Sequence, residues 1–64
     1  MNSKIVGISV ELDDEQAFAL AQFVKRVGFA EMRNNAADDQ EAYLIRDAID
    51  RVRIALSNVG FAPR

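Results

Sequence analysis

Two helix-start signals constrain the fold of this 64-residue chain more than any other feature. The first is D-D-E-Q at 13–16, where Asp13 is a good N-cap and Gln16 completes the spacing of a capping box. The second is D-D-Q-E at 38–41, with Asp38 as the N-cap and Glu41 as its reciprocal partner. Acidic residues in each first turn also suit the positive end of a helix dipole. We therefore predict one helix from about residue 13 and another from about residue 38.

Apolar residues recur at helical spacing after both signals. The first helix, expected over 13–27, carries one stripe on a helical wheel: Ala17, Leu20, Phe23, Val24 and Val27. The second, expected over 38–59, carries a longer stripe: Ala42, Ile45, Ala48, Ile49, Val52, Leu56 and Val59. Helix formers followed by two asparagines lie between them, so we expect a short helical turn at 29–34 and then a loop. The two helices should pack through their stripes as an antiparallel hairpin.

The tetrapeptide V-G-F-A occurs at 27–30 and again at 59–62, each time where an expected helix ends. A glycine just past a helix supplies the positive φ of a Schellman cap, and the next residue makes a hydrophobic contact across that cap. Gly28 and Phe29 take these two positions in the first copy, as Gly60 and Phe61 do in the second. We interpret the repeat as two helix stops, followed at 62–64 by a loose tail.

Residues 4–12 alternate with the two-residue period of a half-buried strand. One face would carry Ile8, Val10 and Leu12, and the other Gly7, Ser9 and Glu11. Because one strand is not stable alone, we expect it to pair with its copy in a second chain or to cover a groove between the helices. The expected fold class is therefore α+β, mainly α. It is a single small domain over 1–64, with an N-terminal strand before the two-helix hairpin.

The composition argues against catalysis and cofactors. The chain has no His and no Cys, which removes the commonest general base, the thiol nucleophile and the usual zinc ligands. Its three glycines are isolated, so no phosphate-binding loop is present in the sequence. The acidic clusters lack the spacing of a calcium loop, and helix capping accounts for them. We expect no catalytic residue, no cofactor and no metal site.

The short chain and its unplaced apolar residues predict association. A chain of sixty-four residues is near the lower limit for folding alone. Without Cys and His it has no disulfide or structural zinc to stabilise it, so we expect a homodimer. Three large apolar residues fall on otherwise polar helix backs: Phe18, Tyr43 and Ile54. With Ile8 and Val10, they are our candidates for an interface with a second copy or a protein partner.

Charge and hydropathy bear on the remaining partners. A net charge of −2 makes nucleic acid a less favoured partner. The N-terminal apolar run is too short for a signal peptide or a membrane span, so we expect a cytoplasmic protein with no membrane contact.

Two families share features with the chain. The order of strand and helices, with ISVELDDEQAFALAQFVKRVG and EAYLIRDAIDRVRIAL, resembles the ribbon–helix–helix regulators. That resemblance implies paired N-terminal strands that read the major groove, although the outward residues here are not the basic or amide residues that read bases. The stretch from ELDDEQAFALAQFVKRVGF to the C-terminus is also similar to small proteobacterial proteins of unknown function, often found in prophages or mobile elements.

These observations predict a non-catalytic protein-interaction module. The second resemblance implies a phage- or mobile-element-borne modulator or inhibitor of a host complex. The alternative is a dimeric DNA-binding regulator of the ribbon–helix–helix type.

Overall fold

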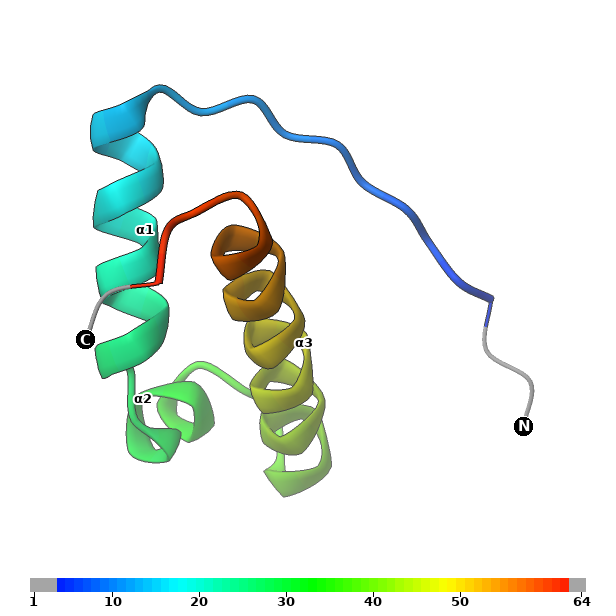
Figure 1. Cartoon of the computed structure of the whole chain (residues 1–64). Helices are drawn as coiled ribbons and strands as arrows, with labels where there is room; N and C mark the ends of the chain where they lie inside the picture. The colour runs from blue at the N-terminus through cyan, green and yellow to red at the C-terminus, as the bar shows by residue number, and fades with distance from the viewer. Residues whose placement is uncertain (1–3, 63–64) are drawn as a thin grey trace.

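The computed structural model describes residues 4–62 and contains three helices in that range. These are α1 (Asp14–Arg26), α2 (Phe29–Asn34) and α3 (Asp39–Asn58). The two long helices run antiparallel, and the short α2 closes one end of the pair (Figure 1). α3 packs against both of the other helices, so it is the central element of the fold.

The predicted N-terminal strand is wrong, because the described residues 4–62 contain helices and no strand. Residues 4–12 are extended, but their backbone makes no backbone–backbone hydrogen bond within the described chain. They do not cover a groove between the helices either, since Ile8 and Val10 are 79% and 67% exposed. Alternation indicates which face a side chain takes, whereas a strand also needs a pairing partner, and residues 13–62 offer none. The fold is therefore mainly α rather than α+β.

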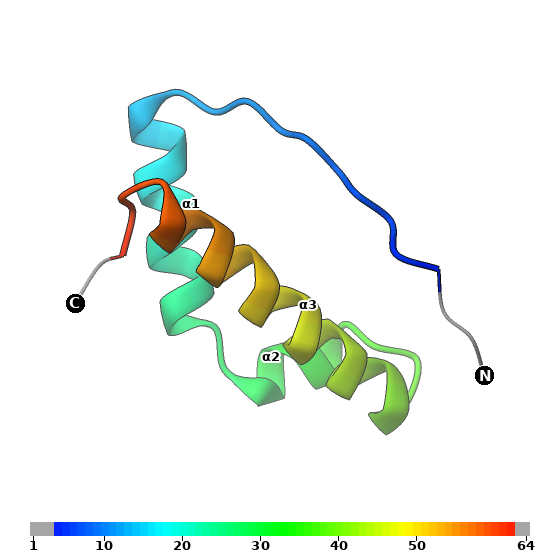
Figure 2. The ribbon, with the colours of Figure 1, turned by 45° about the vertical axis from the view of Figure 1, so that its right-hand side comes forward.

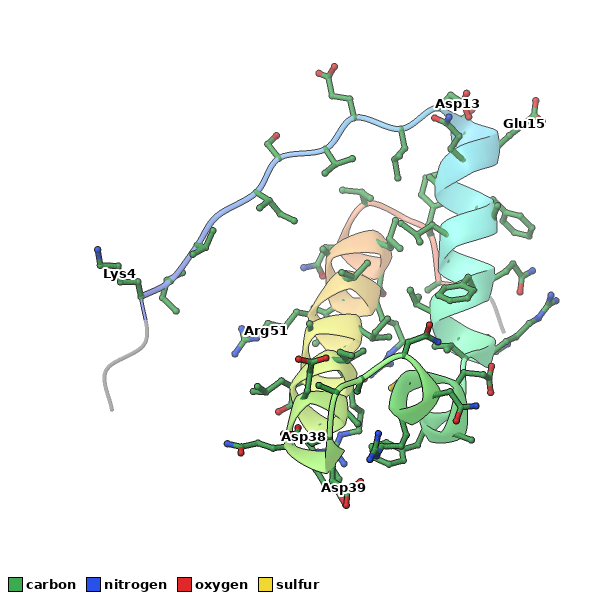
Figure 3. All side chains as sticks on the ribbon, turned by 180° about the vertical axis from the view of Figure 1, so that it is seen from behind. Lys4, Asp13, Glu15, Asp38, Asp39 and Arg51 are labelled. Carbon is green, nitrogen blue, oxygen red and sulfur yellow. The ribbon has the colours of Figure 1, made fainter. Side chains whose placement is uncertain are left out.

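Side-chain caps fix the start of both long helices, at opposite ends of the molecule (Figure 3). Asp13 accepts a hydrogen bond from the Gln16 N–H at 2.7 Å, and the Gln16 side chain accepts one from the Asp13 N–H at 3.1 Å. This is the predicted capping box. At α3, Asp38 accepts from the Glu41 N–H at 2.8 Å, as predicted. The Glu41 carboxylate, however, accepts from the Ala37 N–H at 3.0 Å and not from Asp38, so the predicted reciprocal bond is displaced by one residue.

The two V-G-F-A copies have different structures. Gly60 has φ +98°, and its N–H donates to the Ser57 carbonyl at 3.0 Å. The Phe61 N–H donates to the Leu56 carbonyl at 2.9 Å, which completes the predicted Schellman cap. Gly28 instead has φ −96° and ψ 166°, an extended conformation, and serves as the N-cap of α2. The predicted cap at Gly28 and Phe29 is therefore wrong. α1 ends at Arg26 with Val27 in an extended conformation, and α2 begins at Phe29.

The connection from α2 to α3 is held by side-chain bonds. Arg33 forms an ion pair with Asp39 at 2.6 Å and also donates to the Ala36 carbonyl at 3.2 Å. Asn35 donates from its amide to the Glu31 carbonyl at 2.8 Å, which satisfies one of the last carbonyls of α2. These bonds set the short loop that lets α2 fold back onto α3.

The core is small. Six apolar side chains are buried among residues 4–62: Ala17, Ala21, Val24, Met32, Ala42 and Leu56. Half of them are alanines, whose size lets the helices approach closely but buries little area. The stripe predicted for α1 is rotated, because Ala21 is 2% exposed and Phe23 is 55% exposed. Leu20, Ile49, Val52 and Phe61 add partial cover to this core.

Candidate interaction surfaces

The longest exposed apolar segment is the extended run of residues 5–12, which we call the arm. Ile5, Val6, Ile8 and Val10 are each at least 67% exposed, and Leu12 is 39% exposed. The arm leaves the N-terminus of α1 and stands clear of the helices (Figure 2). The capping box at Asp13 fixes the backbone of the residue that joins the arm to α1.

A second apolar surface runs along α3. It consists of Leu44, Ala48, Ala55 and Val59, which recur at helical spacing, and we call it the α3 stripe. All four residues are exposed, and Leu44 and Val59 reach 62% and 70%. Arg51 belongs to the same side of the helix by its spacing, and it points from α3 towards the side on which the arm runs (Figure 3). The α3 stripe therefore faces the arm side of the molecule.

A third apolar surface lies where α1, α3 and the C-terminal segment meet. Phe61 packs against the core and also lines two hollows, one with Phe18 and the other with Ile54. Phe18 and Ile54 are 53% and 54% exposed. We call this group of three residues the Phe61 face. It brings together two of the residues that the sequence singled out, and the Schellman cap at Gly60 sets the direction in which Phe61 leaves α3.

Tyr43 is part of a different cluster at the other end of α3. Its ring lies 5.0 Å from that of Phe29, tilted by 37°, and the Arg46 guanidinium carbon lies 5.0 Å from the Tyr43 ring centre. Tyr43 and Ile54 are separated by about 16 Å along the helix axis at the usual rise per residue. Tyr43 is half exposed, but its exposed ring is already stacked against two neighbours. The structure therefore does not place it in one surface with Phe18 and Ile54.

Sequence reasoning missed the α3 stripe and the Phe29 ring contact. Ala48 and Val59 were assigned to the interior stripe of α3, but both are exposed. Leu44 could have indicated the α3 stripe, because it lies on the same side of the helix as Ala48 and Ala55 and does not belong to the predicted interior stripe. The sequence predicts that Phe29 both follows a cap and begins a helical turn at 29–34, but it does not predict the contact between the rings of Phe29 and Tyr43.

Within residues 4–62, no group of three or more His, Cys, Asp or Glu side chains is arranged to hold a metal ion. The ion pairs within α3 are exposed, such as Arg53 with Asp50 at 3.0 Å. Pairs of this kind contribute little to stability and indicate a solvated helix back. In the same part of the chain, no helix is both long enough and apolar enough to cross a membrane.

The fold and its surfaces define a small helical domain with exposed apolar faces. The chain belongs to a family of unknown function (DUF7706), whose model matches residues 1–64. This confirms the expected membership of a small family without an assigned activity, while the association with prophages or mobile elements stays a prediction. Neither the curated proteins nor the solved structures contain a match to the chain.

Proposed function

We propose that this protein is a non-catalytic interaction module, which acts as a homodimer and binds a protein partner through the Phe61 face. One observation carries the proposal. Three large apolar side chains from α1, α3 and the C-terminal segment gather around two adjoining hollows, and two of them are half exposed. Protein interfaces are built from such anchors, with polar residues around them.

The residues around the Phe61 face suit a protein partner. Lys25, Arg53 and Asn58 line the same hollow as Ile54, while Asp14 and Glu15 line the hollow beside Phe18. The apolar centre is therefore flanked by positive groups on one side and negative groups on the other. Mixed charge around an apolar anchor favours a specific protein surface, whereas a nucleic-acid site would carry one positive sign.

The kind of partner that we propose rests on the resemblance to small proteins of prophages and mobile elements. Since the proteins that the sequence resembles are often found in prophages or mobile elements, we propose that the partner belongs to a host complex in the cytoplasm. The module would modulate or inhibit that complex by occupying its surface, since the proposal includes no chemical step.

Affinity capture with matched variants tests the proposal. The full chain and the variants Phe18→Ala, Ile54→Ala and Phe23→Ala would each be used to capture proteins from a lysate of the native host. Phe23 is a close control for Phe18, because it lies on the same helix and is 55% exposed against 53%. Truncation of an interface anchor weakens binding by about 2 kcal/mol, or roughly 30-fold, so Phe18→Ala and Ile54→Ala should lose the partner while Phe23→Ala retains it.

Two outcomes would overturn the proposal. Capture of the same proteins by all four chains would show that the Phe61 face does not bind them. Retardation of duplex DNA that weakens steeply as salt rises would favour the ribbon–helix–helix alternative instead.

A further inference from the structure

The arm and the α3 stripe are two unpartnered apolar surfaces of one chain. We infer that they cover each other between two copies, with the arm of each chain lying along the α3 stripe of its partner. This inference rests on the homodimer of the proposed function and specifies which surfaces join it. It leaves the Phe61 face free for the protein partner.

The exposed area of the chain is large enough for a second copy to cover part of it. The whole chain exposes 5611 Å² of surface. A compact folded protein of the same mass, 7.1 kDa, exposes about 4100 Å², so the chain has an excess of roughly 1500 Å². A stable dimer of ordinary size buries about 800 Å² on each partner, which this excess can provide.

The two surfaces match in length and chemistry. The eight extended residues of the arm, 5–12, span about 26 Å, and the α3 stripe from Leu44 to Val59 spans about 22 Å. In an extended segment the side chains of Ile8 and Val10 lie on the same face. The small side chains of Ala48 and Ala55 leave shallow positions on the α3 stripe into which larger side chains fit. Arg51 contributes its methylene stem to the stripe, and its charged head can reach the edge.

The arm runs on the side of the molecule that its own α3 stripe faces, but it stands clear of that helix (Figures 1 and 2). The capping box holds Asp13 in an extended conformation, with φ −75° and ψ 173°, and the arm leaves α1 without contacting α3 (Figures 1 and 2). A second copy can approach the arm without disturbing the cap. A two-fold arrangement then covers the arm and the stripe of both chains at once, whereas a different protein would have to supply two separate surfaces.

Sedimentation equilibrium of the full chain tests the inference. At about 100 µM, above the micromolar limit for interfaces of this size, the wild type should have twice the monomer mass. Ile8→Glu places a charge in the arm and Ala48→Lys places one in the stripe, and each variant alone should sediment as a monomer. Ala19→Lys is the matched control, because it makes the same change at an exposed alanine of α1 outside the three surfaces and should remain a dimer.

Mixing the two monomeric variants distinguishes exchange of arms between chains from an arm that folds back onto its own chain. In the mixed dimer, the unaltered arm meets the unaltered stripe, and the substituted arm meets the substituted stripe with opposite charges. An equimolar mixture should therefore recover the dimer mass, together with any helical circular dichroism that either variant has lost alone. A mixture that stays monomeric would show that the arm of one chain does not lie on the α3 stripe of the other, and would overturn the inference.

Two other outcomes also overturn the inference, and they differ in what they say of the proposed function. A wild type that is monomeric refutes both arm exchange and the homodimer. A dimer that survives both Ile8→Glu and Ala48→Lys refutes arm exchange alone. Loss of the captured partner in Ile54→Ala is measured separately and concerns only the Phe61 face.

Discussion

Alanine at Gly60 should destabilise the protein, whereas alanine at Gly28 should have little effect. Gly60 has φ +98°, a region that side chains with a Cβ rarely adopt, and an added Cβ would meet nothing within 4 Å. The expected loss is therefore a backbone effect only. Left-handed backbone costs a non-glycine residue about 1–2 kcal/mol, so Gly60→Ala should lower the free energy of unfolding by that amount.

At Gly28 the opposing effects are smaller. Its backbone is extended, with φ −96° and ψ 166°, so alanine fits without backbone strain. An added Cβ would lie 3.0 Å from Glu31 Oε1, which accepts the Gly28 N–H at 3.3 Å. That oxygen ends a flexible side chain and can move away, at the expense of a weak bond. The reduced freedom of the unfolded chain contributes about 0.4–1 kcal/mol in the opposite direction, so the net change should be small.

Thermal unfolding followed by circular dichroism measures both variants. All three proteins must be compared at one concentration, because association makes the melting temperature depend on concentration. A loss of 1 kcal/mol lowers the melting temperature of a domain this size by about 4–8 °C, so the two variants should separate clearly. Equal losses at both glycines, or an unchanged melting temperature for Gly60→Ala, would refute the assignment of the two V-G-F-A copies to different structures.

Two further substitutions test the core and the first cap. Ala21→Leu should lower the free energy of unfolding by about 1–3 kcal/mol through overpacking, because Ala21 is 2% exposed. Ala19→Leu, on the exposed side of α1, should leave it unchanged. Equal urea midpoints for the two variants would contradict this prediction. Asp13→Ala should cost about 1 kcal/mol by removing the bond at 2.7 Å to the Gln16 N–H, and an unchanged urea midpoint would show that the capping box does not hold the start of α1.

The helices could be predicted from the sequence because their signals are local. The carboxylates of Asp13 and Asp38 each bond to an N–H three residues away, so a short window contains the whole interaction. The first long helix was expected over 13–27 and extends over Asp14–Arg26, and the second was expected over 38–59 and extends over Asp39–Asn58. Differences of this size at helix ends are usual.

The errors concern contacts that a local pattern does not contain. Residues 4–12 have the alternation of a strand, but pairing depends on a second segment that the rest of the described chain does not supply. Gly28 and Gly60 lie in identical tetrapeptides, but α2 begins directly after the first, and no helix follows the second within residues 4–62. The rotation of the α1 stripe towards Ala21 likewise depends on where α3 lies.

The interaction surfaces were predicted in part for the same reason. Phe18 and Ile54 could be recognised because each is a large apolar residue on a polar helix back. Their meeting at Phe61 could not be predicted, since it depends on the crossing of α1 and α3 and on the direction that the C-terminal segment takes after Gly60. Tyr43 has the same pattern in sequence, but its ring contacts Phe29 and Arg46 at the far end of α3.

The alanine-rich core has a consequence for the amount of this protein in a cell. With six buried side chains among residues 4–62, three of them alanines, a single chain gains little free energy from its own interior. If association supplies the rest, the folded fraction rises with concentration. Chains made at low copy number would spend longer unfolded and would be degraded sooner. The lifetime of the protein would then depend on its own rate of synthesis, giving a threshold in abundance without a separate regulator.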